Sequence, residues 1–220
     1  MRRFLLSAAI ATSLSGGTVR AQAPSPDMQK FASFVVSEPH KQAILAAAAQ
    51  AAQQIPGLCT SARFTFTSKF AVVVPPEFGA DGVPVKGLWK EVVDSEGCGG
   101  QLAYNLLVGV TPEKGVTIAP WIPGDGRTDI TLTRDAMIGA FQYAAVKNPG
   151  CQSNRVITAK FEAYEGDPIP DALHGPNSRA WRETWTVWSC GTKLDVPFGF
   201  TPNAKGTSWR LLEPLRPGTP

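Results

Sequence analysis

Two stretches of the chain decide its fold: residues 89–99 read WKEVVDSEGCG, and residues 181–191 read WRETWTVWSCG. Each begins with Trp-basic-Glu and ends in Cys-Gly, and the two stretches lie 92 residues apart in a chain of 220. When residues 59–108 are laid over residues 151–200 without gaps, twelve positions are identical. Unrelated sequences of average composition would share about three. The pattern therefore predicts an internal duplication.

The cysteines extend this pattern. The interval from Cys59 to Cys98 is 39 residues, and so is the interval from Cys151 to Cys190. Four cysteines allow three pairings, and a duplicated unit with one bridge per copy selects the pairs 59–98 and 151–190. A zinc site made of the four cysteine thiolates is the alternative. We set it aside because the chain has no C-x2-C pair and no histidine close in sequence to a cysteine.

We expect each copy to consist of one helix followed by about four antiparallel strands, with one disulfide per copy, which is an α+β fold. Helix-forming sequence covers residues 41–54 and 136–146, and each stretch is followed by a Pro-Gly pair. Residues 123–126, Pro-Gly-Asp-Gly, are the expected linker. The chain then divides into a first repeat over 24–123 and a second over 124–220.

The first strand of each expected copy differs in phase. Alternation places Phe64, Phe66 and Phe70 on one face in the first copy. In the second copy it places Ile157, Ala159 and Phe161 inward, which is the opposite phase in the same alignment. A one-residue bulge or a sheet covered on both faces would reconcile them.

The expected plan is similar to that of the secreted β-lactamase inhibitory proteins, with their tandem helix-and-strand units, and to that of single cystatin-like domains. The resemblance is architectural. It implies a fold and carries no activity to this chain.

The first 23 residues predict export. A basic start, Met1-Arg2-Arg3, precedes a mostly apolar stretch over residues 4–14, and Ala21-Gln22-Ala23 forms a small-x-small cleavage site. The apolar stretch is much shorter than the roughly 20 residues of a membrane span, so we expect no stable membrane insertion. We expect a periplasmic or secreted protein, cleaved near Ala23.

Cleavage would make the protein formally neutral. Of the 21 basic residues, Arg2, Arg3 and Arg20 fall within the signal, which leaves 18 basic residues against 18 acidic ones. A neutral chain without a run of basic residues lacks the charge that binds phosphates, so nucleic acid is an unexpected partner.

The Trp-basic-Glu triplets are the main candidate site. The candidate residues are aromatic or acidic and lie on the second strand of each expected copy: Trp89, Glu91, Trp181, Glu183, Trp185 and Trp188. Burial of the tryptophans as core would also bury the glutamates, for which Arg63 and Arg155 are the expected charge partners. The alternatives are a surface that binds a sugar or a protein, and a carboxylate-based hydrolase using Glu91 and Glu183.

Histidine and metal chemistry have little support. His40 and His174 do not correspond across the repeat, and no G-x-S-x-G elbow supplies a nucleophile. The acidic group Glu165, Asp167 and Asp171 is better explained as a solvated loop than as a calcium site. We expect no cofactor and no metal.

These features predict an exported, non-enzymatic binding or inhibitory protein with a protein or small-ligand partner in the cell envelope. Its expected contact regions are the aromatic residues, the exposed sheet edge and the loops over residues 78–84 and 169–176. An envelope assembly or scaffold factor is the alternative. The hydrolase is the third possibility.

Overall fold

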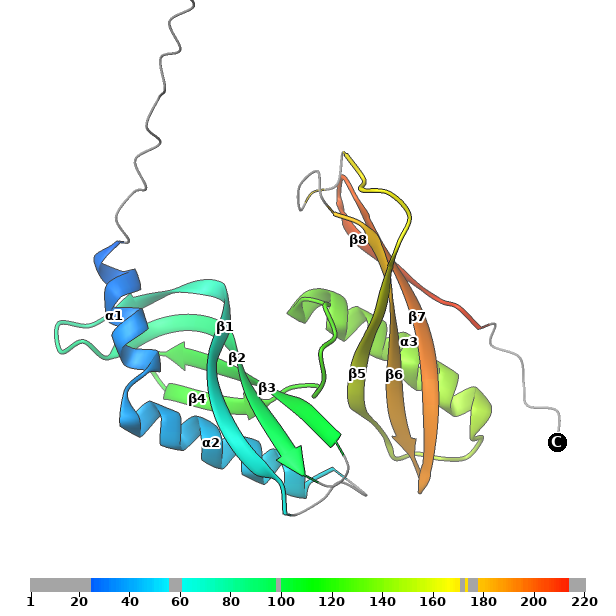
Figure 1. Cartoon of the computed structure of the whole chain (residues 1–220), viewed down its shortest axis with the longest axis horizontal. Helices are drawn as coiled ribbons and strands as arrows, with labels where there is room; N and C mark the ends of the chain where they lie inside the picture. Colours follow the sequence, from blue (N-terminus) through cyan, green and yellow to red (C-terminus); the bar gives the residue numbers. More distant parts are fainter. Residues whose placement is uncertain (1–24, 56–60, 98–99, 171–172, 174–177, 214–220) are drawn as a thin grey trace, which may run out of the picture.

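Two antiparallel sheets form the body of the protein (Figure 1). The computed structural model describes residues 25–55, 61–97, 100–170, 173 and 178–213. Consecutive strands are neighbours in both sheets, which have the orders β1-β2-β3-β4 and β5-β6-β7-β8. The elements are α1 (Pro26–Val35), α2 (Glu38–Gln53), β1 (Arg63–Phe78), β2 (Pro84–Gly97), β3 (Gly100–Thr111), β4 (Gly115–Pro120), α3 (Ile130–Lys147), β5 (Asn154–Glu165), β6 (Ala180–Ser189), β7 (Thr192–Asn203) and β8 (Gly206–Leu211). None of the described helices is both long enough and apolar enough to span a bilayer.

The predicted fold of two copies, each with one helix and its own disulfide, is wrong. Two helices, α1 and α2, precede the first sheet, whereas α3 alone precedes the second. The sequence analysis did not predict α1, although Met28, Phe31 and Val35 recur at the three- to four-residue spacing of a helix face. Its first turn is capped, since the Ser25 hydroxyl accepts a hydrogen bond from the Met28 N–H at 3.3 Å. Phe31 and Val35, one turn apart, are both buried.

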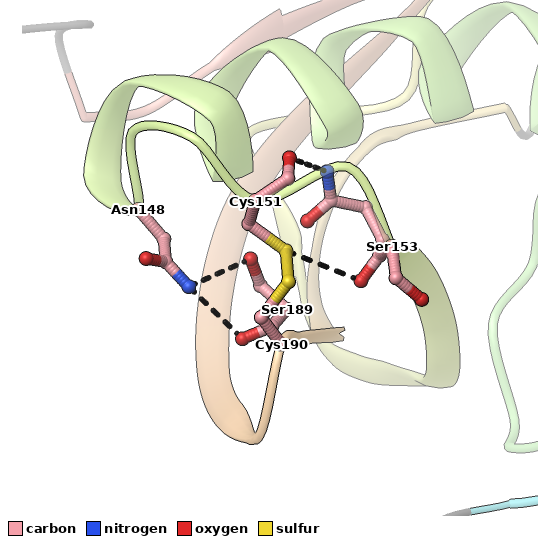
Figure 2. The surroundings of a disulfide bond; sticks show 6 residues. Asn148, Cys151, Ser153, Ser189 and Cys190 are labelled. Atoms are coloured by element: carbon pink, nitrogen blue, oxygen red, sulfur yellow. Dashed lines mark hydrogen bonds between the residues drawn. A yellow bond between two sulfur atoms is a disulfide. The ribbon is translucent and has the colours of Figure 1, made fainter.

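One disulfide, Cys151–Cys190, is found in the described part of the chain, whereas a bridge in each copy was expected. It joins the loop after α3 to the turn between β6 and β7, with 5.8 Å between the two Cα atoms. The amide of Asn148 lies beside it and donates to the carbonyl and hydroxyl oxygens of Ser189, at 3.0 and 3.1 Å (Figure 2). Cys59 and Cys98 lie outside the described residues.

The helix of the second half begins earlier than the expected helix-forming stretch over residues 136–146. The Asp129 side chain accepts a hydrogen bond from the Leu132 N–H at 2.8 Å, so Asp129 is the N-cap and Ile130 the first helical residue. The extra turn adds Leu132 to the core of the second half.

The opposite phases of β1 and β5 have a structural explanation. The register of β1 against β2 shifts between Phe66 and Lys69, and that of β5 against β6 shifts between Val156 and Thr158. In addition, β5 is covered on both faces, because Ile157 is buried in the core of the first half and Val156 in that of the second. Both explanations offered by the sequence therefore apply.

Each sheet packs its inner face against its own helices. In the first half, α1 and α2 cover the sheet, with Phe31, Ile44 and Trp89 fully buried. In the second half, α3 packs against an aromatic core that includes Trp185 and Phe198. The two cores are the main source of stability, since burial of apolar side chains contributes about 1.5–3 kcal/mol each.

The segment between β4 and α3 joins the two sheets. The Gly124 N–H donates to the carbonyl of Ala103 on β3 at 2.7 Å, and the Ala159 N–H of β5 donates to the carbonyl of Pro123 at 2.8 Å. Gly124 is required here, because a Cβ at this position would lie 2.0 Å from the Ala159 carbonyl oxygen and the φ angle is +113°. The expected linker is therefore an ordered element that pairs with both halves.

Candidate functional site

Glu91 is a buried carboxylate in the first half. Its side chain is on β2, and the residue is 2% exposed. The indole N–H of Trp89 donates to Oε1 at 2.6 Å, and Nε2 of His40, from the first turn of α2, lies 2.7 Å from the same oxygen. Both contacts therefore fall on one carboxylate oxygen.

Glu183 holds the corresponding place on β6 and is 1% exposed. The indole N–H of Trp181 donates to Oε1 at 2.8 Å, and that of Trp185 donates to Oε2 at 2.7 Å. The backbone N–H of Arg127 also donates to Oε1, at 2.6 Å. Both oxygens are used, which is the arrangement that makes a buried carboxylate tolerable.

The negative charge of Glu183, in the second half, acts on Lys90 in the first half. Burial lowers the pKa of the Lys90 ammonium on β2, and the negative charge of Glu183 opposes this lowering. Gly126 passes directly over the carboxylate, since a Cβ there would lie 2.9 Å from Oε2. The segment between β4 and α3 thus covers the carboxylate of Glu183.

The expected arginine partners are not used. The guanidinium of Arg155 donates to the backbone carbonyl of Gln54 at 2.8 Å, and the donors to Glu183 are indole and backbone N–H groups. Neutral donors are sufficient here because several of them converge on one carboxylate.

The six candidate residues fall into three environments. Four of them are enclosed in the cores and offer no surface to a ligand: Trp89, Glu91, Glu183 and Trp185. Trp188 is half-buried and packs against the core of the first half. Trp181 is 9% exposed and lines an open cavity, which makes it the one member placed to touch a ligand.

This cavity lies beyond the start of α3, over the end of the second sheet's inner face. Its volume is about 460 Å³. We call it the Trp181 cavity, and it is lined by Arg127, Asp129, Leu132, Tyr164, Ser178, Arg179, Trp181, Pro202 and Thr207. The indole of Trp181 is stacked on the Phe200 ring at 5.1 Å, so the aromatic wall is rigidly supported by the core.

Two guanidinium groups line the Trp181 cavity. That of Arg127 lies over the rings of Phe161 and Tyr164, at 4.3 and 5.1 Å from their centroids. No carboxylate in the described part of the chain forms an ion pair with Arg127 or Arg179. The carboxylate of Asp129 is engaged as the N-cap of α3. The cavity lining therefore combines aromatic surface with two guanidinium groups and one carboxylate, which leaves a net positive charge.

A second cavity of about 560 Å³ lies where the halves meet, and it is a weaker candidate. Its charged groups pair with neighbours, as Lys69 does with Asp94 at 3.4 Å and Lys160 with Glu162 at 3.3 Å. Paired surface charges of this kind leave little affinity for a ligand.

Sequence reasoning identified Trp181 but missed Arg127, Tyr164 and Arg179. Tyr164 had a detectable signal, because it pairs directly with Trp181 across β5 and β6 and both are aromatic. The two arginines had none, since both are exposed residues outside the helices and strands.

Metal chemistry gains no candidate from the structure. Among residues 25–213, as far as they are described, no three His, Cys, Asp or Glu side chains are grouped to hold a metal ion. Glu165, from the acidic group considered above, forms an ion pair with Arg182 at 3.0 Å. His174 and Asp171 lie outside the described residues.

Compared with models of known families, with curated proteins and with solved structures, the chain matches none. The function must therefore be argued from the site itself.

Proposed function

We propose that the protein is an exported binding protein that holds an anionic ligand with an aromatic or apolar part in the Trp181 cavity. The observation that carries this proposal is the pair of guanidinium groups, Arg127 and Arg179, beside the stacked indole of Trp181. Guanidinium groups recognise carboxylate, sulfonate or phosphate oxygens, and the indole provides a flat apolar surface. A cavity of about 460 Å³ lies within the roughly 300–1,000 Å³ of ligand sites.

Preorganisation of Arg127 supports the same proposal. Its backbone N–H is held by Glu183, and its guanidinium lies over two aromatic rings. An arginine fixed at both ends loses little conformational entropy when it binds an anion. The buried carboxylate of Glu183 thus serves binding indirectly, by positioning Arg127, and has no proposed catalytic role.

The exported location rests on the predicted signal over residues 1–23, which lie outside the described part of the chain. A disulfide between Cys151 and Cys190 fits an oxidising compartment. The envelope or the extracellular medium would then supply the ligand.

The proposal is tested with two probes of the same shape, naphthalene-2-sulfonate and neutral 2-naphthol, titrated against tryptophan fluorescence at pH 7. We expect the sulfonate to bind about tenfold more tightly, because it adds charge-assisted hydrogen bonds to a guanidinium. Arg127→Gln should remove most of this preference. Arg210→Gln, which changes an exposed arginine on β8 outside the cavity, should leave it intact. Equal affinity for the two probes, or the same loss in both variants, contradicts the proposal.

A further inference from the structure

The place that is a cavity in the second half is filled by a helix in the first. Phe31 of α1 lies 5.2 Å from the ring of Trp89, edge to face, and Phe34 lies 6.2 Å from the same ring. Trp89 and Trp181 hold equivalent positions, because each is two residues before a buried glutamate and each donates its indole N–H to that glutamate. The chain itself therefore shows what kind of element covers this sheet position.

The equivalence extends to the helix that follows. His40 is the third residue of α2, and its ring lies 4.5 Å from that of Phe34. Leu132 is the third residue of α3, and it lines the Trp181 cavity. Phe34 thus occupies a gap between Trp89 and the start of α2, and the matching gap between Trp181 and Leu132 is open.

The second half has no preceding helix to place in this gap. The residues before α3 run between the sheets instead, where the Trp121 N–H donates to the carbonyl of Asn105 and the Gly126 N–H to that of Ala159. A chain held in this way cannot fold back over Trp181. Within the described part of the chain, no helix covers Trp181 as α1 covers Trp89.

The charged residues around the gap beside Trp181 differ from those around Phe34, so the segment that fills this gap must differ in charge from α1. In the first half, the neighbour of Phe34 at the start of the helix is His40, which is engaged with Glu91. The Trp181 cavity instead presents Arg127 and Arg179, which form no ion pair in the described residues, and a single carboxylate, Asp129, which caps α3, so its net charge is positive. An occupant must therefore bring an acidic group as well as an aromatic ring.

We infer that the ligand of the Trp181 cavity is an amphipathic helical segment of a partner protein, seated as α1 is seated on Trp89. An aromatic side chain fills the gap between Trp181 and Leu132, and an acidic side chain reaches Arg127 or Arg179. This inference rests on the proposed function, since it names the ligand of the same cavity. It corresponds to the helix-in-groove mode of peptide recognition.

The probe is a capped synthetic peptide with the sequence of residues 25–37, in which Lys30→Glu adds an acidic group one turn before Phe34 to the Asp27 that all three peptides share. Two matched peptides carry either the original Lys30 or, in addition to Lys30→Glu, Phe34→Ala. Affinity for the purified protein is measured by calorimetry and by displacement of naphthalene-2-sulfonate. We expect the acidic peptide to bind about fivefold more tightly than the Lys30 peptide, and the Phe34→Ala peptide to bind at least about tenfold more weakly than the acidic one, because it loses a buried aromatic side chain.

The outcomes separate this inference from the proposed function. If the sulfonate binds and no peptide displaces it, the helical partner is wrong while the anion site stands. If neither binds, both are wrong. The protein could also bind a second copy of itself by seating α1 in the partner copy's Trp181 cavity. In that case it dimerises and does not bind the peptides, and Phe34→Ala in the protein both abolishes the dimer and restores peptide binding. This result would identify a second copy as the occupant and exclude a separate partner.

Discussion

In the first half of the molecule a tryptophan on the second strand is sealed beneath a helix, and in the second half its counterpart lines an open cavity. Trp89 is fully buried under Phe31 and Phe34, whereas Trp181 has Arg127, Tyr164 and solvent beside it. The sheets and the buried glutamates are nearly the same. The difference lies in the segment before the long helix, which folds onto the sheet as α1 in one half and runs between the sheets in the other.

Under the proposed function, this difference lets one sheet position serve stability in the first half and binding in the second. Where the chain supplies its own cover, the aromatic surface becomes core. Where the segment before the helix runs between the sheets instead, the proposed function leaves the same surface open to a ligand, and the two guanidinium groups beside it would favour an anionic one. Four predictions test the comparison, beginning with the largest expected effect.

Removal of the cover in the first half should have the largest effect. Phe31→Ala deletes a fully buried ring that contacts both Trp89 and Phe70, so we expect the free energy of unfolding to fall by about 4 kcal/mol. Urea denaturation measures it, with Phe141→Ala on the exposed face of α3 as the control, expected to cost less than about 1 kcal/mol. A loss below about 1 kcal/mol in Phe31→Ala would show that α1 is not part of the core.

The two glutamates should respond differently to the same change. In Glu183→Gln, either orientation of the amide places an NH₂ group against a donor, because the indoles of Trp181 and Trp185 use different oxygens. We expect a loss of about 2 kcal/mol. In Glu91→Gln, one carbonyl oxygen can accept from Trp89 and still contact His40, so the loss should be about 1 kcal/mol or less.

Urea denaturation of both variants at pH 7 measures this difference, and each glutamate serves as the control for the other. Equal losses would mean that the separate use of two oxygens at Glu183 has no energetic consequence. A larger loss at Glu91 would reverse the ranking and place the more constrained carboxylate in the first half.

Much of the scaffold could be predicted from residue patterns. Alternation along the second strand of each half correctly places Trp89 with Glu91, and Trp181 with Glu183 and Trp185, on the inner face. The Pro-Gly signals correctly end the two long helices near Gln53 and Lys147. These features are local, so the sequence around each residue is sufficient to predict them.

The site could not be predicted in the same way, because it depends on contacts between distant residues. Arg127 follows a Pro-Gly-Asp-Gly segment that suggests only a linker, yet its N–H reaches a carboxylate 56 residues away. The expected pairing of Arg155 with a buried glutamate failed for a related reason: nearby indoles and a distant backbone N–H satisfy the carboxylate without any cation. Such partners depend on the path of the chain between the sheets.

High pH should weaken the second half through Tyr143 on α3. Burial raises the pKa of Tyr143 to about 12, and its hydrogen bond to Glu213 at 2.7 Å together with the negative charges of Glu213 and Asp195 contributes to the rise. The unfolded chain loses this proton near pH 10, so stability that is fully present below pH 10 falls as the pH rises to about 12.

We expect Tyr143 to account for a loss on the order of 1 kcal/mol between pH 10 and pH 12, a figure reduced for solvent screening. Thermal unfolding across this range measures it, and Tyr143→Phe should flatten the profile. Tyr104 in the first half is the comparison, because burial alone raises its pKa and no carboxylate assists. Tyr104→Phe should therefore change the profile less, and an unchanged profile in Tyr143→Phe would contradict the assignment.

The smallest expected effect is on the wall of the Trp181 cavity. Tyr164 is 48% exposed, so Tyr164→Ala should lower the free energy of unfolding by no more than about 1 kcal/mol. The same change removes one of the two rings beneath the Arg127 guanidinium, and an exposed cation–π contact of this kind contributes about 0.5–1 kcal/mol. Affinity for naphthalene-2-sulfonate should accordingly fall about threefold, while Tyr164→Phe, which keeps the ring, should bind as the unmodified protein does. If Tyr164→Ala lowers stability and leaves affinity unchanged, Tyr164 belongs to the core of the second half as Phe31 belongs to that of the first, and the contrast between a covered and an open tryptophan fails at this residue.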